Sequence, residues 1–316
     1  MNCGKQVNPK LRNTYSMIDR LLLKLNKIRL KVSGYMNNKL YVYPGHYYSP
    51  IPSLPDIKKN SKRIFAPFPS EIPGIQLREQ EQLELLDQFL PFYEELPFKP
   101  HKTEGLRYFF ENGGYSYSDA IFLYSMLRHL RPRRMIEVGS GYSSLVTLDT
   151  NRLFFDNGID FTCIEPYPEG FYSLIDEEDK GNFKMIVSNL QDVDLDEFSK
   201  LEENDILFID STHVVKVDSD VNYVFSRILP ALPKGVYIHF HDIFYPFEYP
   251  KEWIYDNFAW NELYMLRAFL EYNDAFRIVA FNTYLEHFHE DYFRKNLPLC
   301  MENPGGSIWL QKIKDD

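Results

Sequence analysis

Two short apolar runs in the second half of the chain each end in an aspartate with a histidine close by. Residues 205–210 lead into Ser-Thr-His213, and residues 236–242 end in His239-Phe-His241-Asp242. In open sheets of parallel strands, active sites form beyond the carboxyl ends of the strands. Neighbouring strands lie about 5 Å apart, so the two tips can meet. We therefore predict a catalytic cluster of four polar side chains: Asp210, His213, His241 and Asp242.

This cluster suits two kinds of chemistry. His213 or an aspartate could act as a general base that takes the proton of an acceptor hydroxyl. Alternatively, Asp210 and Asp242 could hold a hard divalent cation such as Mg²⁺, which would lower the pKa of that hydroxyl. Histidine is not a favoured Mg²⁺ ligand, and His239 is interpreted as an ordinary core residue. Both chemistries remain open at this stage.

A glycine turn precedes the cluster at residues 137–141, with the sequence Glu-Val-Gly-Ser-Gly. A dinucleotide-binding fingerprint has a third glycine three residues after the second, but Ser144 stands there. The acid at Glu137 suits an ammonium group better than a pyrophosphate. S-adenosylmethionine carries both an ammonium and a sulfonium, so we expect it to bind at this turn. The expected contacts are Glu137, Gly139, Ser140, Gly141, Tyr142, Ser143 and Ser144, and Ser143 or Ser144 could also cap the following helix.

Further cofactor contacts are expected at the next two strand ends. Glu165 ends the predicted strand 161–165 and could accept hydrogen bonds from both ribose hydroxyls. Beyond the third strand, Asp192 is our choice for the adenine amino group, with Gln191 next. Either residue could instead cap the helix expected at 194–201. Asp210 is included among the cofactor contacts as well as the catalytic ones.

Alternating strand and helix patterns position these residues from Arg134 onwards. Strands are predicted at 134–138, 161–165, 183–187, 205–209, 236–241, 276–281 and 307–311. Helices are predicted at 143–155, 169–178, 194–201, 216–228 and 259–272. Short apolar strands separated by helices indicate an α/β, Rossmann-like, largely parallel sheet with helices on both faces. A tight turn at 303–307 predicts a hairpin between the last two strands, which makes the last one antiparallel.

The first hundred residues have a different character. A basic amphipathic helix is predicted at 11–32, a proline- and tyrosine-rich irregular arm at 35–75 and a helix at 76–96. We expect Ser118-Asp119 to cap a helix at 119–130. The basic helix could pack on the domain or on a second subunit of a homodimer, or attach peripherally to an anionic membrane surface. We favour packing and predict two regions, 1–104 and 105–316.

Composition limits the partners. The net charge of −10 argues against nucleic acid as the main partner, although residues 1–34 carry a local surplus of seven positive charges. Three cysteines without metal-type spacing, and no recognisable secretory signal, favour the cytoplasm, including the inner membrane face if the basic helix attaches there. Aromatic and proline residues at 243–250 suit the wall of a sugar or aromatic acceptor pocket.

Together these motifs resemble the class I S-adenosylmethionine-dependent methyltransferases over roughly residues 105–312. The resemblance rests on Glu137–Gly141, Glu165, Phe208-Ile-Asp210 and the final Gly-Gly-Ser-Ile-Trp segment, and it implies a seven-stranded sheet whose last strand is antiparallel. The stretches at 209–213 and 239–242 resemble a bacterial subgroup related to sugar and macrolide O-methyltransferases. That resemblance implies methylation of a hydroxyl on a small-molecule or carbohydrate acceptor.

In metal-dependent relatives, acids after the fourth and fifth strands hold Mg²⁺, and these positions match Asp210 and Asp242. Here His241 stands where some relatives have an acid, which leaves it as a base or an acceptor contact. Two alternatives to a methyltransferase remain: an NAD-dependent oxidoreductase and a non-catalytic binding module built on the methyltransferase fold.

Overall fold

The computed structural model describes residues 24–25, 28–29 and 41–315. The chain divides into two compact units. The smaller contains Met1–Ala66 and Tyr255–Ala259, and the larger contains Pro67–Ile254 and Trp260–Asp316. The boundary expected at residue 104 therefore lies inside the larger unit, which holds the whole sheet and every predicted site residue.

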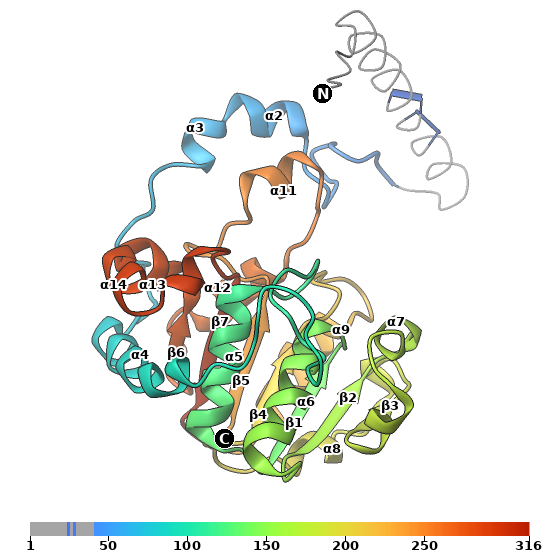
Figure 1. Cartoon of the computed structure of the whole chain (residues 1–316). Helices are drawn as coiled ribbons and strands as arrows, with labels where there is room; N and C mark the ends of the chain where they lie inside the picture. Colours follow the sequence, from blue (N-terminus) through green and yellow to red (C-terminus); the bar gives the residue numbers. More distant parts are fainter. Residues whose placement is uncertain (1–23, 26–27, 30–40, 316) are drawn as a thin grey trace, which may run out of the picture. The chain divides into compact units, whose positions relative to one another are not determined.

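A seven-stranded sheet in the order β3-β2-β1-β4-β5-β7-β6 forms the centre of the larger unit (Figure 1). β3, β2, β1, β4 and β5 run parallel, and β7 is antiparallel to both of its neighbours, as expected. The strands are β1 (Arg134–Val138), β2 (Asp160–Ile164), β3 (Lys184–Ile186), β4 (Ile206–Ile209), β5 (Tyr237–His241), β6 (Phe276–Phe281) and β7 (Ser307–Lys312). The predicted Rossmann-like fold class is confirmed.

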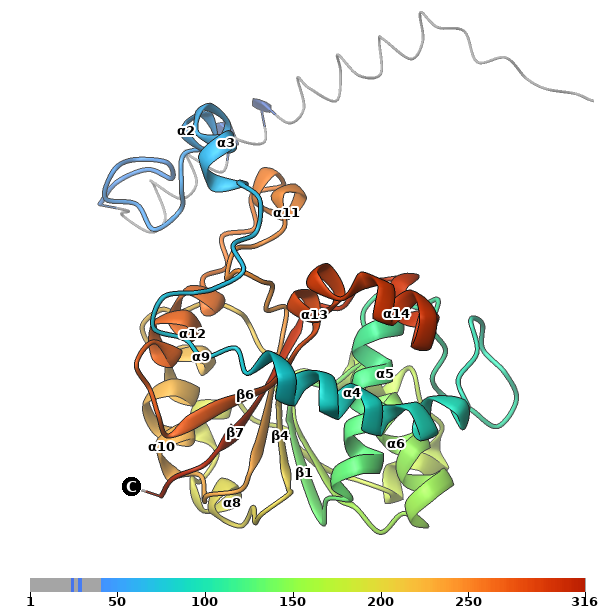
Figure 2. The same cartoon turned by 90° about the vertical axis from the view of Figure 1, so that its left-hand side faces the viewer.

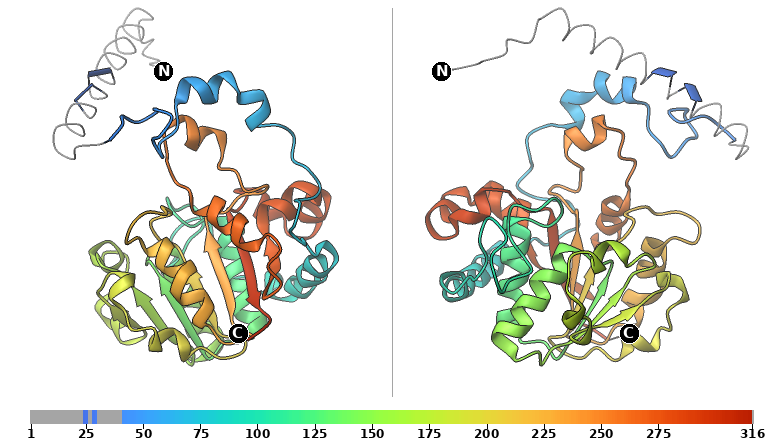
Figure 3. Two further views of the ribbon diagram at one scale, coloured as in Figure 1. Left: turned by 180° about the vertical axis from the view of Figure 1, so that it is seen from behind. Right: turned by 45° about the vertical axis from the view of Figure 1, so that its right-hand side comes forward.

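Helices cover both faces of the sheet, which explains why the central strands are continuous apolar runs. Every residue of β4 and β5 is buried. Seen edge-on in Figure 2, α4 (Glu79–Glu94), α5 (Tyr117–Leu130) and α6 (Tyr142–Phe155) lie on one side. On the other side lie α9 (Asp220–Tyr223), the π-helix η3 (Val224–Ile228), α10 (Leu229–Ala231) and α12 (Glu262–Leu270), as the view from behind in Figure 3 shows.

Shorter elements complete the connections. They are α7 (Glu169–Tyr172), η1 (Glu177–Gly181), η2 (Leu190–Asp192), α8 (Asp196–Ser199), α11 (Lys251–Tyr255), α13 (Asn282–Phe288), α14 (Glu290–Asn296) and η4 (Pro298–Met301). The helices predicted at 169–178, 194–201 and 216–228 are thus shorter or broken. The last of them starts only at Asp220, because the Ser219 side chain accepts a hydrogen bond from the Asn222 N–H and caps it there.

Two sequence expectations about turns and caps are wrong. β6 and β7 are neighbours, but α13, α14 and η4 lie between them in the chain, so the turn at 303–307 does not join them in a tight hairpin. In addition, α5 begins at Tyr117 after Ser116, so Ser118 and Asp119 lie within its first turn. Their side chains instead hold the segment before β7: the Ser118 hydroxyl donates to Glu286, and Asp119 accepts from the Gly306 N–H at 3.1 Å.

The smaller unit contains two short helices, α2 (Leu54–Lys59) and α3 (Ser61–Ile64), so the arm expected at 35–75 is not irregular throughout. The Ser53 hydroxyl accepts from the Asp56 N–H at 3.4 Å, and this cap starts α2. Most of the basic helix predicted at 11–32 lies outside the described residues. Lys24, Leu25, Ile28 and Arg29 are described, and they are helical and exposed. In the part of the chain that the structure describes, no helix has the length and hydropathy needed to cross a membrane.

Candidate active site

A cavity of about 380 Å³ opens at the carboxyl ends of β1, β2 and β4. It lies where the strand order changes direction, at which open α/β sheets usually bind their ligands. Three of the predicted site residues line it, namely Gly139, Glu165 and Asp210, and they come from three different strands. Gln191 and Lys216 are also in its wall. The cavity therefore joins residues that are far apart in the sequence.

Gly139 allows the turn after β1 to lie against the end of β4. Its φ angle is +97°, and a Cβ at this position would be 2.1 Å from the carbonyl oxygen of Asp210. The backbone on both sides is tied to the neighbouring strands, because Gly139 N donates to the Ile164 carbonyl at 3.0 Å and Asp210 N donates to the Val138 carbonyl at 2.9 Å. The close approach that requires glycine here is therefore to the chain itself. Around Gly141, by contrast, a Cβ would meet no atom within 4 Å.

Glu137 does not reach the cavity, which corrects its predicted role as a cofactor contact. Side chains alternate along a strand, so Glu137 lies on the same face as Met135, beneath α6. Its carboxylate accepts hydrogen bonds from the hydroxyls of Ser143 and Ser144, the second at 2.8 Å. Burial raises the pKa of Glu137 to about 8, although the two serines act in the opposite direction. Glu137, Ser143 and Ser144 thus hold the turn to the helix instead of facing the cavity.

Ser140 and Tyr142 lie beside the same turn but are not part of the cavity wall. Among the described atoms, the buried Ser140 hydroxyl has no hydrogen-bond partner. The Tyr142 ring packs edge-on against Phe109, with ring centroids 6.0 Å apart. Of the three serines in the turn, Ser140 is therefore the one whose hydroxyl has no partner among the described atoms.

At the second and third strand ends, the structure separates the predicted residues. Glu165 lines the cavity, and its Oε1 accepts from the Tyr167 N–H at 2.8 Å. Asp192 is exposed and does not line the cavity itself, but it accepts at 3.2 Å from the amide of Asn189, which does, so its choice as the adenine contact stays a prediction. Gln191 lines the cavity instead and donates to the Asp218 carbonyl.

The predicted cluster after β4 and β5 does come together. His213 Nε2 lies 3.3 Å from Asp210 Oδ1 and 3.5 Å from Asp242 Oδ2. His241 is adjacent, with Nε2 3.6 Å from Asp242 Oδ1 and its ring 5.1 Å from that of Tyr115. Because Asp210 belongs both to this cluster and to the cavity wall, the two features form one continuous site.

The charges within the cluster shift the pKa of each member. Burial lowers the pKa of His213, but hydrogen bonds to Asp210 and Glu262 outweigh it and raise this pKa to about 10. For Asp210, burial acts upward, but the charges of His241 and His213 lower its pKa overall. For Asp242, burial prevails and raises the pKa. At neutral pH, therefore, His213 carries a proton and Asp242 is the more basic of the two aspartates.

Sequence reasoning missed Glu262, the first residue of α12. Its Oε2 lies 2.8 Å from His213 Nδ1, and its side chain is 1 % exposed. In the sequence, Asn261-Glu262 precedes an apolar helical stretch, and this pattern indicates only that a helix begins there. Nothing in the sequence relates this glutamate to a histidine 49 residues earlier.

Comparison with known proteins adds the family. A family model described as a methyltransferase domain matches residues 136–243. An uncharacterized protein of Archaeoglobus fulgidus is 34 % identical over 170 residues, which cover 51 % of this chain and 74 % of that protein. The chain belongs to this methyltransferase-domain family, whose model it matches over residues 136–243.

Two solved structures are similar to this chain at low identity. The O-methyltransferase TomG from Streptomyces achromogenes, in complex with S-adenosylmethionine, is 12 % identical, with a TM-score of 0.42 over 81 % of this chain and 96 % of that one. A methyltransferase of Podospora anserina bound to S-adenosylhomocysteine is 14 % identical, with a TM-score of 0.42 over 83 % of this chain and 97 % of that one.

The donor set of this cluster does not fit the Mg²⁺ predicted between Asp210 and Asp242. Mg²⁺ requires oxygen ligands in octahedral geometry. Here the two carboxylates supply oxygen atoms, but the third candidate ligand atom is a nitrogen, His213 Nε2, 3.3 Å from Asp210 Oδ1 and 3.5 Å from Asp242 Oδ2. We therefore derive no catalytic step through a metal.

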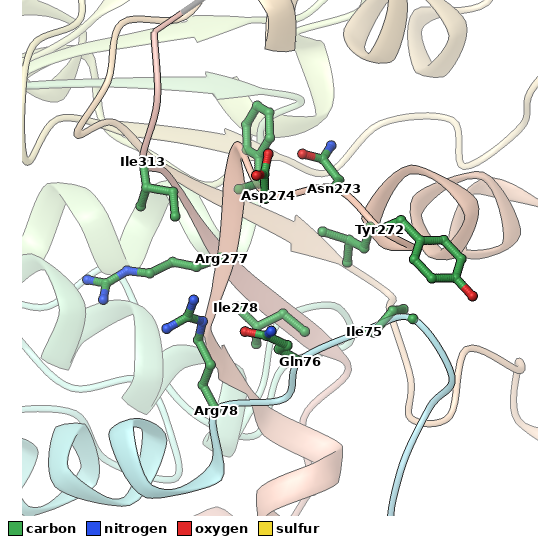
Figure 4. Close-up of a pocket in the computed structure, with 12 residues that line it drawn as sticks. Ile75, Gln76, Arg78, Tyr272, Asn273, Asp274, Arg277, Ile278 and Ile313 are labelled. Atoms are coloured by element: carbon green, nitrogen blue, oxygen red, sulfur yellow. The ribbon is translucent and has the colours of Figure 1, made fainter.

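A second cavity, of about 430 Å³, lies beside the start of β6 (Figure 4). The start of β6 is at the opposite end of the sheet from Asp210, because β6 runs parallel to β5 through the antiparallel β7. Arg78 and Arg277 both line this cavity, and both bind the carboxylate of Glu81, at 2.8 and 3.2 Å. Their charges are already paired within the chain, so we assign no chemistry to this cavity.

Proposed function

We propose that this methyltransferase binds S-adenosylmethionine in the cavity at the carboxyl ends of β1, β2 and β4. We further propose that it methylates a hydroxyl of a small-molecule or carbohydrate acceptor. The observation that carries the proposal is the position of Asp210, which lines the cavity and contacts His213 at 3.3 Å. A cofactor in the cavity would thus lie directly beside a cluster able to handle a proton.

The cavity offers suitable partners for each part of the cofactor. Glu165, which follows β2, would accept hydrogen bonds from the two ribose hydroxyls. Gln191 would meet the adenine edge, and the backbone at Gly139 would meet the amino-acid end. When bound, the cofactor supplies a methyl group that its sulfonium has already activated.

The cluster then has to remove the acceptor's proton and stabilise the charge that develops on oxygen. Asp242 is the better base, because burial raises its pKa, whereas the pKa of Asp210 is lowered. His213 keeps its proton at neutral pH and can donate from Nε2 to the developing oxyanion. Asp210 then orients His213 at the edge of the cavity.

The family assignment leaves the NAD-dependent alternative without a supporting observation, and cofactor binding tests it directly. We expect calorimetry on the full chain to detect binding of S-adenosylmethionine and no binding of NAD(H). Release of S-adenosylhomocysteine is then measured against a panel of monosaccharides, catechols and aliphatic alcohols. Asp210→Ala should abolish turnover while leaving a folded protein, and the exposed Asp291→Ala is the matched control. Binding of NAD(H) without S-adenosylmethionine would disprove the proposal.

A further inference from the structure

A buried carboxylate lies behind the catalytic histidine, on the side away from the two aspartates. Glu262 Oε2 is 2.8 Å from His213 Nδ1, and the glutamate is 1 % exposed. Among the described atoms, the other carboxylate oxygen, Oε1, is buried without a hydrogen-bond partner. A carboxylate in such surroundings is costly unless it is paired, so the contact with His213 is what accommodates it.

The backbone around Glu262 holds the same loop. The Asn261 and Glu262 N–H groups both donate to the His213 carbonyl, at 3.1 and 3.2 Å. The Asn261 side chain makes two hydrogen bonds to the backbone of Val215. It accepts from the Val215 N–H at 2.6 Å and donates to the Val215 carbonyl at 3.3 Å. His213 itself has a φ angle of +58°, a left-handed conformation that a non-glycine residue adopts only when its surroundings enforce it. The start of α12 therefore fixes the backbone of the His213 loop.

The ring of His213 is also held across its face. Its centroid lies 4.4 Å from that of Trp260. One edge of the imidazole faces Glu262, and the opposite edge faces Asp210 and Asp242. A flip of the ring would place carbon atoms against these carboxylates and leave them without their donor. The observed orientation is thus the one that satisfies all three.

We propose that Glu262 is the positioning residue of this active site: it keeps His213 Nδ1 protonated and thereby directs Nε2 toward Asp210, Asp242 and the acceptor. The inference rests on the proposed function for its catalytic meaning, since Glu262 does not line the cofactor cavity and acts only through His213. A carboxylate that accepts from Nδ1–H fixes both the orientation and the protonation of an imidazole.

The test uses the full chain labelled with ¹⁵N-histidine. In the wild type, ¹H–¹⁵N spectra should show an Nδ1–H signal of His213 that exchanges slowly with solvent, assigned by its loss in His213→Asn. In Glu262→Gln, this signal should shift and exchange at least about tenfold faster, because the neutral amide is a weaker acceptor than a carboxylate. Glu262→Asp, which keeps the charge, should retain part of the protection. Glu271→Gln, at the other end of α12, is the matched control.

Two results would overturn the inference: an unprotonated Nδ1 on His213 in the wild type, or an unchanged signal in Glu262→Gln. If Glu262→Gln does not fold, Glu262→Asp decides the question. Its shorter side chain should lose the 2.8 Å contact, so a His213 Nδ1–H that exchanges as slowly as in the wild type would contradict the inference. Calorimetry with S-adenosylmethionine on the same samples separates the two proposals. Failure of the wild type to bind the cofactor rejects the function, whereas the histidine spectra report on Glu262 independently.

Discussion

At the scale of single residues, four acids near the carboxyl end of the sheet have different surroundings and therefore different roles. Glu137 is buried beneath α6 and bound by two serines. Glu165 faces the cavity. Asp210 joins the cavity to His213, and Asp242 is the more basic member of that cluster. The burial of each acid and its hydrogen-bond partners, more than its residue type, decide which of these roles it can have.

The role of Glu165 can be tested by removing its carboxylate. We expect Glu165→Ala to weaken S-adenosylmethionine binding about 10- to 100-fold, because hydrogen bonds to a charged group contribute roughly 1.5–3 kcal/mol. Calorimetric titration measures the change in Kd. The exposed Glu169→Ala, four residues further along, should bind like the wild type. An unchanged Kd in Glu165→Ala would show that the ribose assignment is wrong.

The role of Asp242 can be tested by replacing its carboxylate with an amide. Asp242→Asn should lower the rate of methyl transfer by about 100-fold or more, because general-base catalysis typically contributes 10²–10⁴-fold. Cofactor affinity should stay near that of the wild type, since Asp242 does not line the cavity. The readout is S-adenosylhomocysteine release with whichever acceptor the panel identifies, and Asp291→Asn is the control. Near-normal turnover in Asp242→Asn would remove Asp242 as the base.

At the scale of elements, the register of the sheet brings the site together. Val138 pairs with Ile209, and Ile209 pairs with Phe240, so the ends of β1, β4 and β5 lie side by side. β4 and β5 are followed directly by Asp210 and Asp242, and β1 is followed by Gly139. The Gly139 turn then lets β1 end against the backbone of Asp210. The geometry of the site thus depends on how closely the end of β1 can approach the end of β4.

Two glycines of the same turn provide a matched pair for testing this approach. Gly139→Ala should destabilise the fold by at least about 1–2 kcal/mol from its left-handed backbone alone, and further because its Cβ would lie 2.1 Å from the Asp210 carbonyl oxygen. Gly141→Ala should cost much less, because its Cβ would meet no atom within 4 Å. Denaturant unfolding of both variants measures the difference. Equal losses of stability would contradict the close-approach explanation.

At the scale of the whole molecule, buried carboxyl groups make the stability depend on pH. Burial raises the pKa of Glu137 and of Glu286 to about 8, from an ordinary value of 4.5. A group whose pKa is higher in the folded state binds its proton more tightly there, so its contribution to stability is full below about pH 4.5 and is lost as the pH rises through 8. Both groups therefore act in the same direction over the same pH range.

We expect the melting temperature to fall as the pH is raised from about 5 to about 9, with a smaller fall in Glu137→Gln and in Glu286→Gln. Glutamine keeps the size of the side chain and cannot ionise. Thermal unfolding across this pH range measures the effect, and the exposed Glu290→Gln should follow the wild-type curve. A pH dependence in Glu137→Gln identical to that of the wild type would mean that Glu137 does not keep its proton in the folded protein.

The sequence by itself determined the alternation of strands and helices, the antiparallel last strand, the glycine turn and the aspartates at the tips of β4 and β5. These follow from hydrophobic periodicity and turn chemistry, which depend on residues a few positions apart. Only the tertiary structure decided that Glu137 faces α6, that Gln191 lines the cavity in place of Asp192, and that Glu262 supports His213. The direction of a side chain and the contact between residues 49 positions apart are set by the packing of whole elements, and no local pattern records that packing.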